Sequence, residues 1–165
     1  MVAHTGSASK ALAPGLRIGW LVVPPEWSGS VLAAKEAADL GGPVLEQLAF
    51  AELIAGGGYD RHLRAARREH RRRRDALLDA LTRHLPRARV TGIAAGLHLV
   101  VELPPGTDDR RIAEDAARAG IAPIALSTLR LDAPGPPGLV LGYARDSPSV
   151  LHAAVFTLAG VLRLD

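Results

Sequence analysis

A short segment near the start of the chain brings together a lysine, two serines and an arginine. Ser7 and Ser9 precede Lys10, a Pro14-Gly15 pair follows it, and Arg17 comes shortly after. A Pro-Gly pair is typical of a chain reversal, so we expect Arg17 to return beside the two hydroxyls and complete an anion site. A lysine held there would feel the guanidinium and partial burial, and both favour a neutral, nucleophilic amine. An exposed lysine in a serine-rich turn explains the spacing equally well.

Two other lysine chemistries are excluded by the sequence itself. The spacing from Ser7 to Lys10 matches the S-x-x-K pattern of penicillin-binding enzymes, but those enzymes also need a later K-T-G. The chain has one further lysine, Lys35, and it is followed by Glu36. Neither lysine precedes a Ser or Thr at the end of a glycine-rich loop, which also excludes a phosphate-binding P-loop.

The composition indicates one or two compact folded units rather than a disordered chain. Of its 165 residues, 48% are hydrophobic and only 4% aromatic, so small aliphatic side chains must fill the core. The absence of cysteine excludes a disulfide framework and thiolate chemistry. The sequence has neither a signal-peptide pattern nor an apolar stretch of membrane-spanning length. We therefore expect a cytoplasmic location without membrane contact.

The first half of the chain combines short extended pieces with helices. An apolar run at residues 18–23 predicts a buried strand, preceded by a turn at residues 6–9. Glycine and proline breaks separate three helices after it, which we expect at residues 26–40, 44–55 and 59–85. The last of these is rich in arginine and has its apolar positions late, so only its second half should pack on other elements.

The second half has a different pattern, with short strands and two helices separated by loops. Asp108 and Ser147 are suitable N-caps for the helices, and Pro148 occupies the favoured first helical position. We predict a small α/β layer domain with two helices on one face of a sheet. The expected strands cover residues 88–91, 97–103, 121–126 and 139–144, the helices residues 108–119 and 147–162, and a loop residues 132–138.

The segment from Thr5 to Pro24 resembles the S-x-S-K-x-x-x-P-G-x-R-x-G-[WY] motif of fold type I pyridoxal 5′-phosphate (PLP) proteins. More narrowly, it is similar to the aminotransferase-like domain of MocR/GabR-type regulators in the GntR family. The resemblance is most specific between Lys10 and Arg17, and it extends over nearly the whole chain. Further matching stretches are residues 43–49, 58–64, 71–81 and 139–144.

This resemblance implies a cofactor and a role for each residue of the motif. Lys10 would form the Schiff base with PLP and act as the catalytic lysine, while Ser7 and Arg17 would hold the phosphate. Ser9 would add a further phosphate or backbone contact. The implied fold class is α/β, as the C-terminal part of a fold type I PLP-dependent transferase. Its parts would be a remnant of the large-domain sheet (residues 1–57), a long basic connecting helix (58–85) and a small α/β domain (86–165).

The same resemblance implies what lies outside this sequence. In the family, residues upstream of the lysine bind the pyridine ring and form the DNA-binding winged helix-turn-helix. We therefore expect a chain truncated at its N-terminus that binds the cofactor poorly by itself. The expected partners of the full-length protein are an amino acid or other small amine, a second copy in a homodimer, and DNA through the missing domain.

The residue that binds a substrate carboxylate is not fixed by the resemblance. Aminotransferases of this fold commonly place an arginine in the late strand, where a guanidinium matches a carboxylate. Val140 occupies the corresponding position, with Arg130 and Arg145 on either side. Both arginines are candidates for the carboxylate, and a solvated loop position explains either one as well.

Three functions remain open at this point. The first is the PLP-binding effector domain of a MocR/GabR-type regulator. The second is a fragment of a free-standing class I/II aminotransferase, in which Lys10 would also move a proton at the substrate α-carbon. The third is a nucleic-acid-binding module built on the arginines between Arg61 and Arg74, but that run has no aromatic residue to stack on bases. The six histidines have no metal-ligand spacing, so we expect no metal site.

Overall fold

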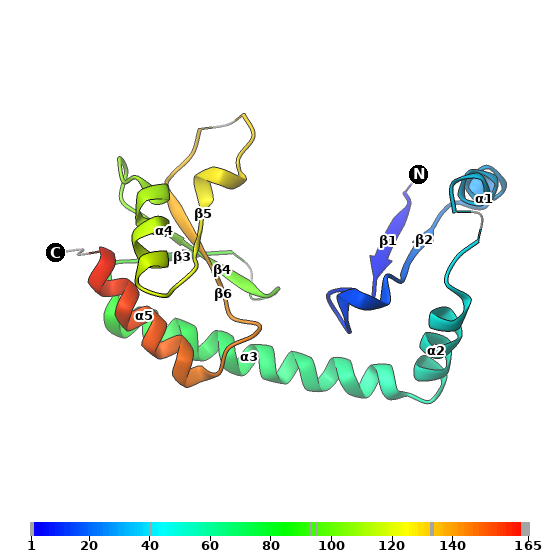
Figure 1. The fold of residues 1–165 in the computed structure, drawn as a ribbon, viewed down its shortest axis with the longest axis horizontal. Coiled ribbons are helices and arrows are strands. Elements are labelled where there is room, and N and C mark those ends of the chain that lie inside the picture. The colour runs from blue at the N-terminus through cyan, green and yellow to red at the C-terminus, as the bar shows by residue number, and fades with distance from the viewer. Residues whose placement is uncertain (1, 40, 93, 95, 133, 163–165) are drawn as a thin grey trace. The chain divides into compact units, whose positions relative to one another are not determined.

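The computed structural model of the chain describes residues 2–39, 41–92, 94, 96–132 and 134–162 (Figure 1). It contains two compact units, residues 1–66 and residues 67–165. The boundary between them lies inside one long helix, α3 (Gly58–His84). The three-part division expected from the sequence stays a prediction.

Unit 1 is built on a two-stranded antiparallel sheet. Strand β1 (His4–Ser7) pairs with β2 (Gly19–Val22), and the loop between them contains a short 3-10 helix, η1 (Pro14–Leu16). Two helices follow, α1 (Pro25–Asp39) and α2 (Val44–Ala55), before the first turns of α3. Both helices lie where the sequence predicts them, although position 40 is outside the described residues. The turn expected at residues 6–9 starts later, because β1 continues to Ser7.

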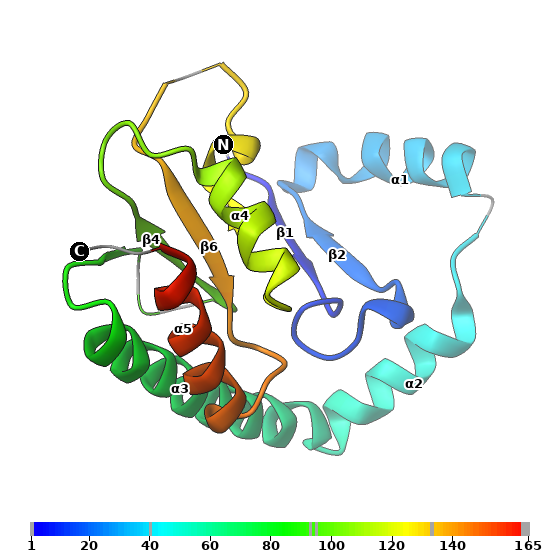
Figure 2. The ribbon, with the colours of Figure 1, turned by 60° about the vertical axis from the view of Figure 1, so that its left-hand side comes forward.

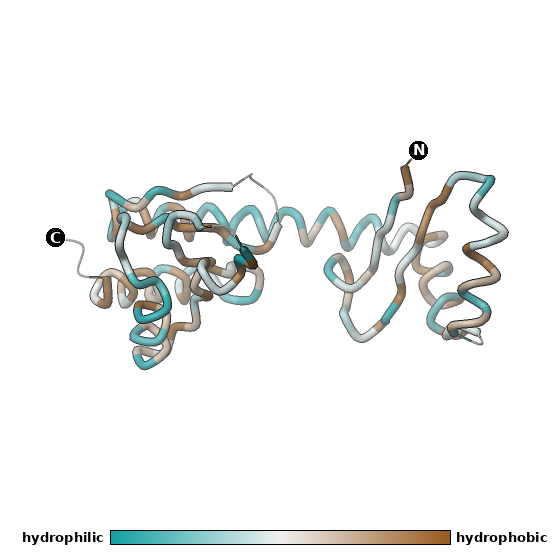
Figure 3. The backbone as a smooth tube through the Cα atoms, turned by 90° about the horizontal axis from the view of Figure 1, so that it is seen from above, coloured by the Kyte–Doolittle hydropathy of each residue, from teal (hydrophilic) through white to brown (hydrophobic). Residues whose placement is uncertain are grey.

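Unit 1 has almost no buried core of its own. Neither α1 nor α2 contains a buried residue, and all of β2 is exposed. Several large apolar side chains are therefore exposed. Figure 3, which colours the backbone by hydropathy, shows hydrophobic residues along β2. A two-stranded sheet is marginally stable in water unless its faces are covered. The exposed side chains include Leu21, Val22, Leu32, Val44, Leu45 and Leu48.

Unit 2 contains a four-stranded antiparallel sheet in the order β3-β4-β6-β5. Helices α4, α5 and the second part of α3 contribute to one core with this sheet, and Figure 2 shows α4 and α5 over the same face. The sequence predicted two helices there, and α3 adds a third. The strands are β3 (Arg89–Thr91), β4 (His98–Glu102), β5 (Ile124–Ala125) and β6 (Gly138–Gly142), and the helices are α4 (Asp109–Arg118) and α5 (Pro148–Leu162).

The buried residues of unit 2 recur at the spacing expected for strands and for helices. Leu99 and Val101 alternate into the core from β4, as Leu139 and Leu141 do from β6. In α3 the buried residues are Leu77, Ala80 and Leu81, which share one helical face. This confirms that the late apolar positions of the arginine-rich helix are the ones that pack. Within the described residues, no helix is long and apolar enough to cross a membrane.

The strand predicted at residues 121–126 is much shorter in the structure. Only Ile124–Ala125 forms β5, and a 3-10 helix, η2 (Leu126–Leu129), follows at once. At its start, the Ile121 N–H donates to the Ala116 carbonyl at the end of α4 at 2.9 Å. After its end, the buried carboxylate of Asp109 accepts hydrogen bonds from the Ser127 N–H at 3.0 Å and the Ser127 hydroxyl at 2.6 Å. The Gly138 N–H donates to the same carboxylate at 3.0 Å. Asp109 therefore draws residue 127 away from the strand ladder and ties α4 to the start of β6.

The Asp109 network makes the stability of the protein depend on pH. Burial acts to raise the pKa of Asp109, but the hydrogen bonds from Ser127 and Gly138, together with the Arg130 charge, lower that pKa below its ordinary value. A carboxyl group with a lowered folded-state pKa stabilises the fold above its unfolded pKa of about 4, and this contribution is lost as pH falls through the folded pKa.

We predict that Asp109→Asn lowers the free energy of unfolding at pH 7 by about 1–3 kcal/mol, because an amide cannot accept all three hydrogen bonds. The deficit relative to wild type should shrink below about pH 4, where the wild-type carboxyl is itself protonated. Urea denaturation at several pH values measures both effects. The exposed Glu114→Gln change in the same helix is the matched control. A deficit that does not change with pH would contradict this account.

Candidate functional site

The lysine, serines and arginine singled out in the sequence all lie on the β1–β2 hairpin. Ser7 pairs with Gly19, and the Ala8 N–H donates to the Ile18 carbonyl at 2.9 Å, which continues the same register. Along the chain, Ser9 directly follows Ala8 and Arg17 directly precedes Ile18. The predicted reversal of the chain is therefore present, and it brings the two ends of the Lys10 loop together.

Lys10 lies on a helix-like turn directly after β1. The Ala8 carbonyl accepts hydrogen bonds from the N–H groups of Leu12 at 2.7 Å and Ala13 at 3.2 Å, and Ala8 itself is fully buried. Lys10 lies on the exposed side of this turn. The expectation that Lys10 is partly buried is thus wrong for this structure, because the turn directs Ala8 inward and leaves Lys10 in solvent.

Arg17 has an unusual backbone conformation. Its φ of 52° and ψ of 27° are left-handed, and it is the only non-glycine residue with positive φ in the described part of the chain. This conformation costs a non-glycine residue about 1–2 kcal/mol. Glycine would adopt this conformation without steric cost.

An aromatic cluster supports the hairpin from one side. The indole of Trp20 covers Gly6 so closely that a Cβ on Gly6 would come within 2.3 Å of it. Trp20 stacks with Phe50 of α2 at a centroid distance of 6.5 Å, and Phe50 meets Tyr59 of α3 edge-on at 5.1 Å. These contacts join β2, α2 and the start of α3, so they position the lysine loop within unit 1.

His62 holds the lysine loop directly. Its Nε2 lies 2.9 Å from the carbonyl oxygen of Ala11, the residue after Lys10. Because a carbonyl oxygen only accepts, Nε2 must be the protonated donor nitrogen. No pattern in the sequence indicates this role, because His62 stands among arginines and is distant in sequence from the loop that it contacts.

The two arginines considered for a substrate carboxylate both lie in unit 2. Arg130 Nη2 donates to the Pro136 carbonyl, and its guanidinium fills the space beside Gly135. Arg130 therefore holds its own loop in place. Arg145 is exposed and lines a pocket beside α5. Val140 pairs with Val100 on one side and Ile124 on the other. The assignment of a carboxylate ligand stays a prediction.

Three arginines in the arginine-rich part of α3, Arg72, Arg73 and Arg74, form local ion pairs. Glu69 accepts from Arg72 at 2.9 Å and from Arg73 at 2.8 Å. These hydrogen bonds, led by that from Arg72, lower the pKa of Glu69. Arg73 also donates to the Ala144 carbonyl in unit 2. These three arginines are therefore engaged with their own unit.

Comparison with known proteins shows relatives of two kinds. No family model matches the chain. It is 35% identical over 122 residues to the 2-aminoadipate transaminase of Thermus thermophilus, covering 73% of this chain and 30% of that protein. It is 28% identical over 158 residues to the probable rhizopine catabolism regulatory protein MocR of Rhizobium meliloti, covering 95% of this chain and 32% of that protein. The chain thus spans about a third of the length of these relatives.

Comparison with solved structures also finds an aminotransferase similar to this chain. The α-aminoadipate aminotransferase LysN of Thermus thermophilus, complexed with N-(5′-phosphopyridoxyl)-L-leucine, matches with a TM-score of 0.87 and 31% identity. The match covers 98% of this chain and 42% of that one. The fold and the lysine hairpin thus define part of an α/β PLP-dependent transferase. The chain belongs with the fold type I PLP aminotransferases and the MocR-type regulators related to them, and the predicted fold class is confirmed.

The role of His62 can be tested without a cofactor. We predict that His62→Ala raises the amide hydrogen exchange rates of Leu12 and Ala13 about 2- to 10-fold, because the loop loses a hydrogen bond worth about 0.5–1.5 kcal/mol. His62→Gln should restore part of the protection, since an amide also donates to a carbonyl. The control is His70→Ala, further along the same helix. Equal exchange in His62→Ala and wild type would exclude the positioning role.

Proposed function

We propose that this chain is part of the PLP-binding, aminotransferase-like effector domain of a MocR/GabR-type transcriptional regulator. The observation that carries the proposal is the hairpin, which joins Ser7, Ser9 and Lys10 on one arm to a strained Arg17 on the other. Two hydroxyls and a guanidinium match a phosphate, and a neighbouring primary amine matches a carbonyl. The side chains available on this hairpin therefore fit the cofactor of the relatives.

Each residue of the hairpin has a distinct task in this proposal. Arg17 supplies charge and directed donors to the phosphate, and Ser7 and Ser9 add hydroxyl donors. Lys10 supplies the amine that attaches the cofactor covalently. His62 keeps the loop carrying that amine in place through Ala11. When bound, PLP supplies an electrophilic carbonyl that reacts with amines and a ring that withdraws electrons.

The alternative is a free-standing class I/II aminotransferase. There Lys10 would in addition take a proton from the substrate α-carbon and return it elsewhere, as a general base and acid. Val140, between Val100 and Ile124, cannot form the bidentate carboxylate contact that an arginine makes in the late strand, so Arg130 or Arg145 would have to supply it under either function. A regulator must bind an amine, whereas an enzyme must also orient it for turnover.

The partners and location belong to the same proposal. The effector is an amino acid or other small amine, and the complete protein acts as a homodimer in the cytoplasm. Contact with DNA is assigned to a segment outside these 165 residues. The exposed apolar surface of unit 1, including β2 and α2, supports the view that further polypeptide covers it in the working protein.

Cofactor titration tests the proposal. We predict that PLP develops a new visible absorbance band, weak in the isolated chain, with wild type and with Lys35→Ala, but not with Lys10→Ala. Because the chain corresponds to 42% of LysN, the same variants should also be compared in a chimaera in which this chain replaces the matching part of that enzyme. An amino acid that shifts the band without turnover supports the regulator, and sustained amino transfer supports the enzyme. If a folded chimaera that carries Lys10→Ala forms the band as well as the wild-type chimaera does, the result would contradict both the regulator and the enzyme proposals.

A further inference from the structure

Three neighbouring arginines of α3 form no ion pair or hydrogen bond within the part of the chain that the structure describes. They are Arg67, Arg68 and Arg71, which we call the arginine cluster, and all three are exposed. The cluster lies in unit 2, because that unit begins at its first residue. The three arginines that follow the cluster differ from it, since they pair with Glu69 or Asp75.

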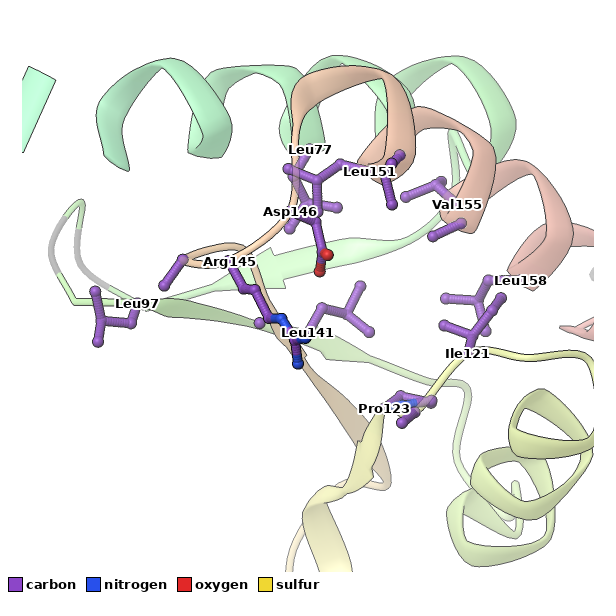
Figure 4. Close-up of a pocket in the computed structure, with 15 residues that line it drawn as sticks. Leu77, Leu97, Ile121, Pro123, Leu141, Arg145, Asp146, Leu151, Val155 and Leu158 are labelled. Carbon is purple, nitrogen blue, oxygen red and sulfur yellow. The ribbon is translucent and has the colours of Figure 1, made fainter. Parts of the chain in front are cut away.

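The arginine cluster faces away from the buried side of α3. Leu77 lies on that buried side, and Figure 4 shows it with Leu151 of α5 on the wall of a pocket of about 340 Å³. An α-helix turns by about 100° per residue, so Arg68 is about 180° and Arg71 about 120° around the helix from Leu77. Packing of α3 on the core of unit 2 therefore leaves the cluster open to a ligand.

The arginine cluster concentrates positive charge on a short stretch of helix. Its first and last members are four residues apart and its second and last are three apart, so their side chains are neighbours and repel one another. Glu69 stands between them in sequence, but its carboxylate is held by Arg72 at 2.9 Å and Arg73 at 2.8 Å. A multivalent anion bound to the cluster would remove this repulsion and stabilise the folded state.

A short chain of phosphate groups matches the arginine cluster in charge and in spacing. Arg67 and Arg71 are about 6 Å apart along the helix axis. A triphosphate presents three adjacent phosphate groups to such a stretch, and a guanidinium group can donate two parallel hydrogen bonds to a phosphate. One strand of duplex DNA has a charge for every 3.4 Å or so of its axis, and thus offers only about two charges over the same length. The density of charge therefore favours an oligophosphate over a duplex.

We propose that the arginine cluster binds an oligophosphate chain, such as inorganic triphosphate or the triphosphate group of a nucleotide. Arg68 and Arg71 contact the phosphates from the exposed face of the helix, and Arg67 contacts them from its flank. The sequence of α3 has no aromatic residue after Tyr59, so a nucleotide base would have no ring to stack on and recognition is confined to the phosphates. The proposal does not depend on Lys10 or on PLP.

Calorimetric titration of the 165-residue chain with sodium triphosphate tests the proposal, at a constant ionic strength of about 0.15 M. We expect saturable binding, with orthophosphate bound at least about 10-fold more weakly because it contacts fewer guanidinium groups. ATP should bind within about 3-fold of triphosphate, because its base has no partner. Equal affinity for orthophosphate and triphosphate, or ATP bound at least about 10-fold more tightly than triphosphate, would overturn the ligand assignment.

Variants locate the binding site. Arg68→Gln and Arg71→Gln should each weaken triphosphate binding at least about 5-fold, and the double variant should abolish it. Arg83→Gln is the matched control, because it removes the same charge from an exposed position of the same helix, where Arg83 pairs with Asp79 at 3.0 Å. It should bind as wild type does. Without ligand, Arg71→Gln should resist urea at least as well as wild type, because it relieves repulsion within the cluster.

Two further comparisons separate this site from the hairpin and from the rest of the transferase fold. Arg17→Gly should keep the triphosphate binding that the double variant loses, because it changes only the proposed cofactor-phosphate site. The LysN chimaera should also bind triphosphate, and this binding should be lost in a chimaera that carries Arg68→Gln and Arg71→Gln. Circular dichroism checks that each variant is folded.

Four results would overturn the proposal. One is the absence of saturation at about 10 mM triphosphate with a folded chain. The second is a loss of binding in Arg83→Gln or in Arg17→Gly as large as that in Arg68→Gln. The third is a folded chimaera that does not bind triphosphate, because the arginine cluster would then be covered in the complete fold. The fourth is a short DNA duplex that binds through the same arginines at least about 10-fold more tightly than triphosphate.

Discussion

The antiparallel register between β1 and β2 determines which side chains can act together in unit 1. Pairing of Ser7 with Gly19, continued by the Ala8 N–H to the Ile18 carbonyl, closes the loop that carries Lys10. A shift of the strand pairing by one residue would turn every side chain of β1 to the opposite face of the sheet. Trp20 over Gly6 supports this register within the hairpin, and His62 of α3 supports it through Ala11. The proposed cofactor site thus rests on a few backbone hydrogen bonds and two long-range contacts.

The two units differ in what stabilises them. Unit 2 has a continuous aliphatic core and a buried carboxylate, Asp109, whose hydrogen bonds join α4, η2 and β6. Unit 1 has one fully buried side chain, Ala8, among its described residues, and it exposes much of its apolar surface. Because burial of apolar area is the main stabilising term, the chemistry-bearing hairpin belongs to the less stable unit. This agrees with relatives in which the matched region is about a third of the chain.

Much of the fold could be predicted from local patterns. The N-cap at Asp108 is confirmed by its hydrogen bond from the Arg111 N–H at 3.1 Å, and the late apolar face of α3 packs as its spacing indicates. The early end of β5 could not be predicted, because the carboxylate that binds Ser127 is distant in sequence. The exposure of Lys10 and the contact of His62 with Ala11 likewise depend on tertiary packing. The motif indicated which residues could bind the cofactor. The burial and contacts of those residues could be seen only in the structure.

The most direct test of the central claim compares the chain's two lysines. The chain is mixed with one equivalent of PLP, reduced with borohydride and mapped by peptide mass spectrometry. The account predicts that the label is found mainly on Lys10 and only weakly on Lys35. It also predicts that Arg17→Gly removes this preference without unfolding the chain, because glycine tolerates the left-handed backbone but has no guanidinium. Equal labelling of both lysines in the wild type, or a preference for Lys35, would contradict the assignment of Lys10.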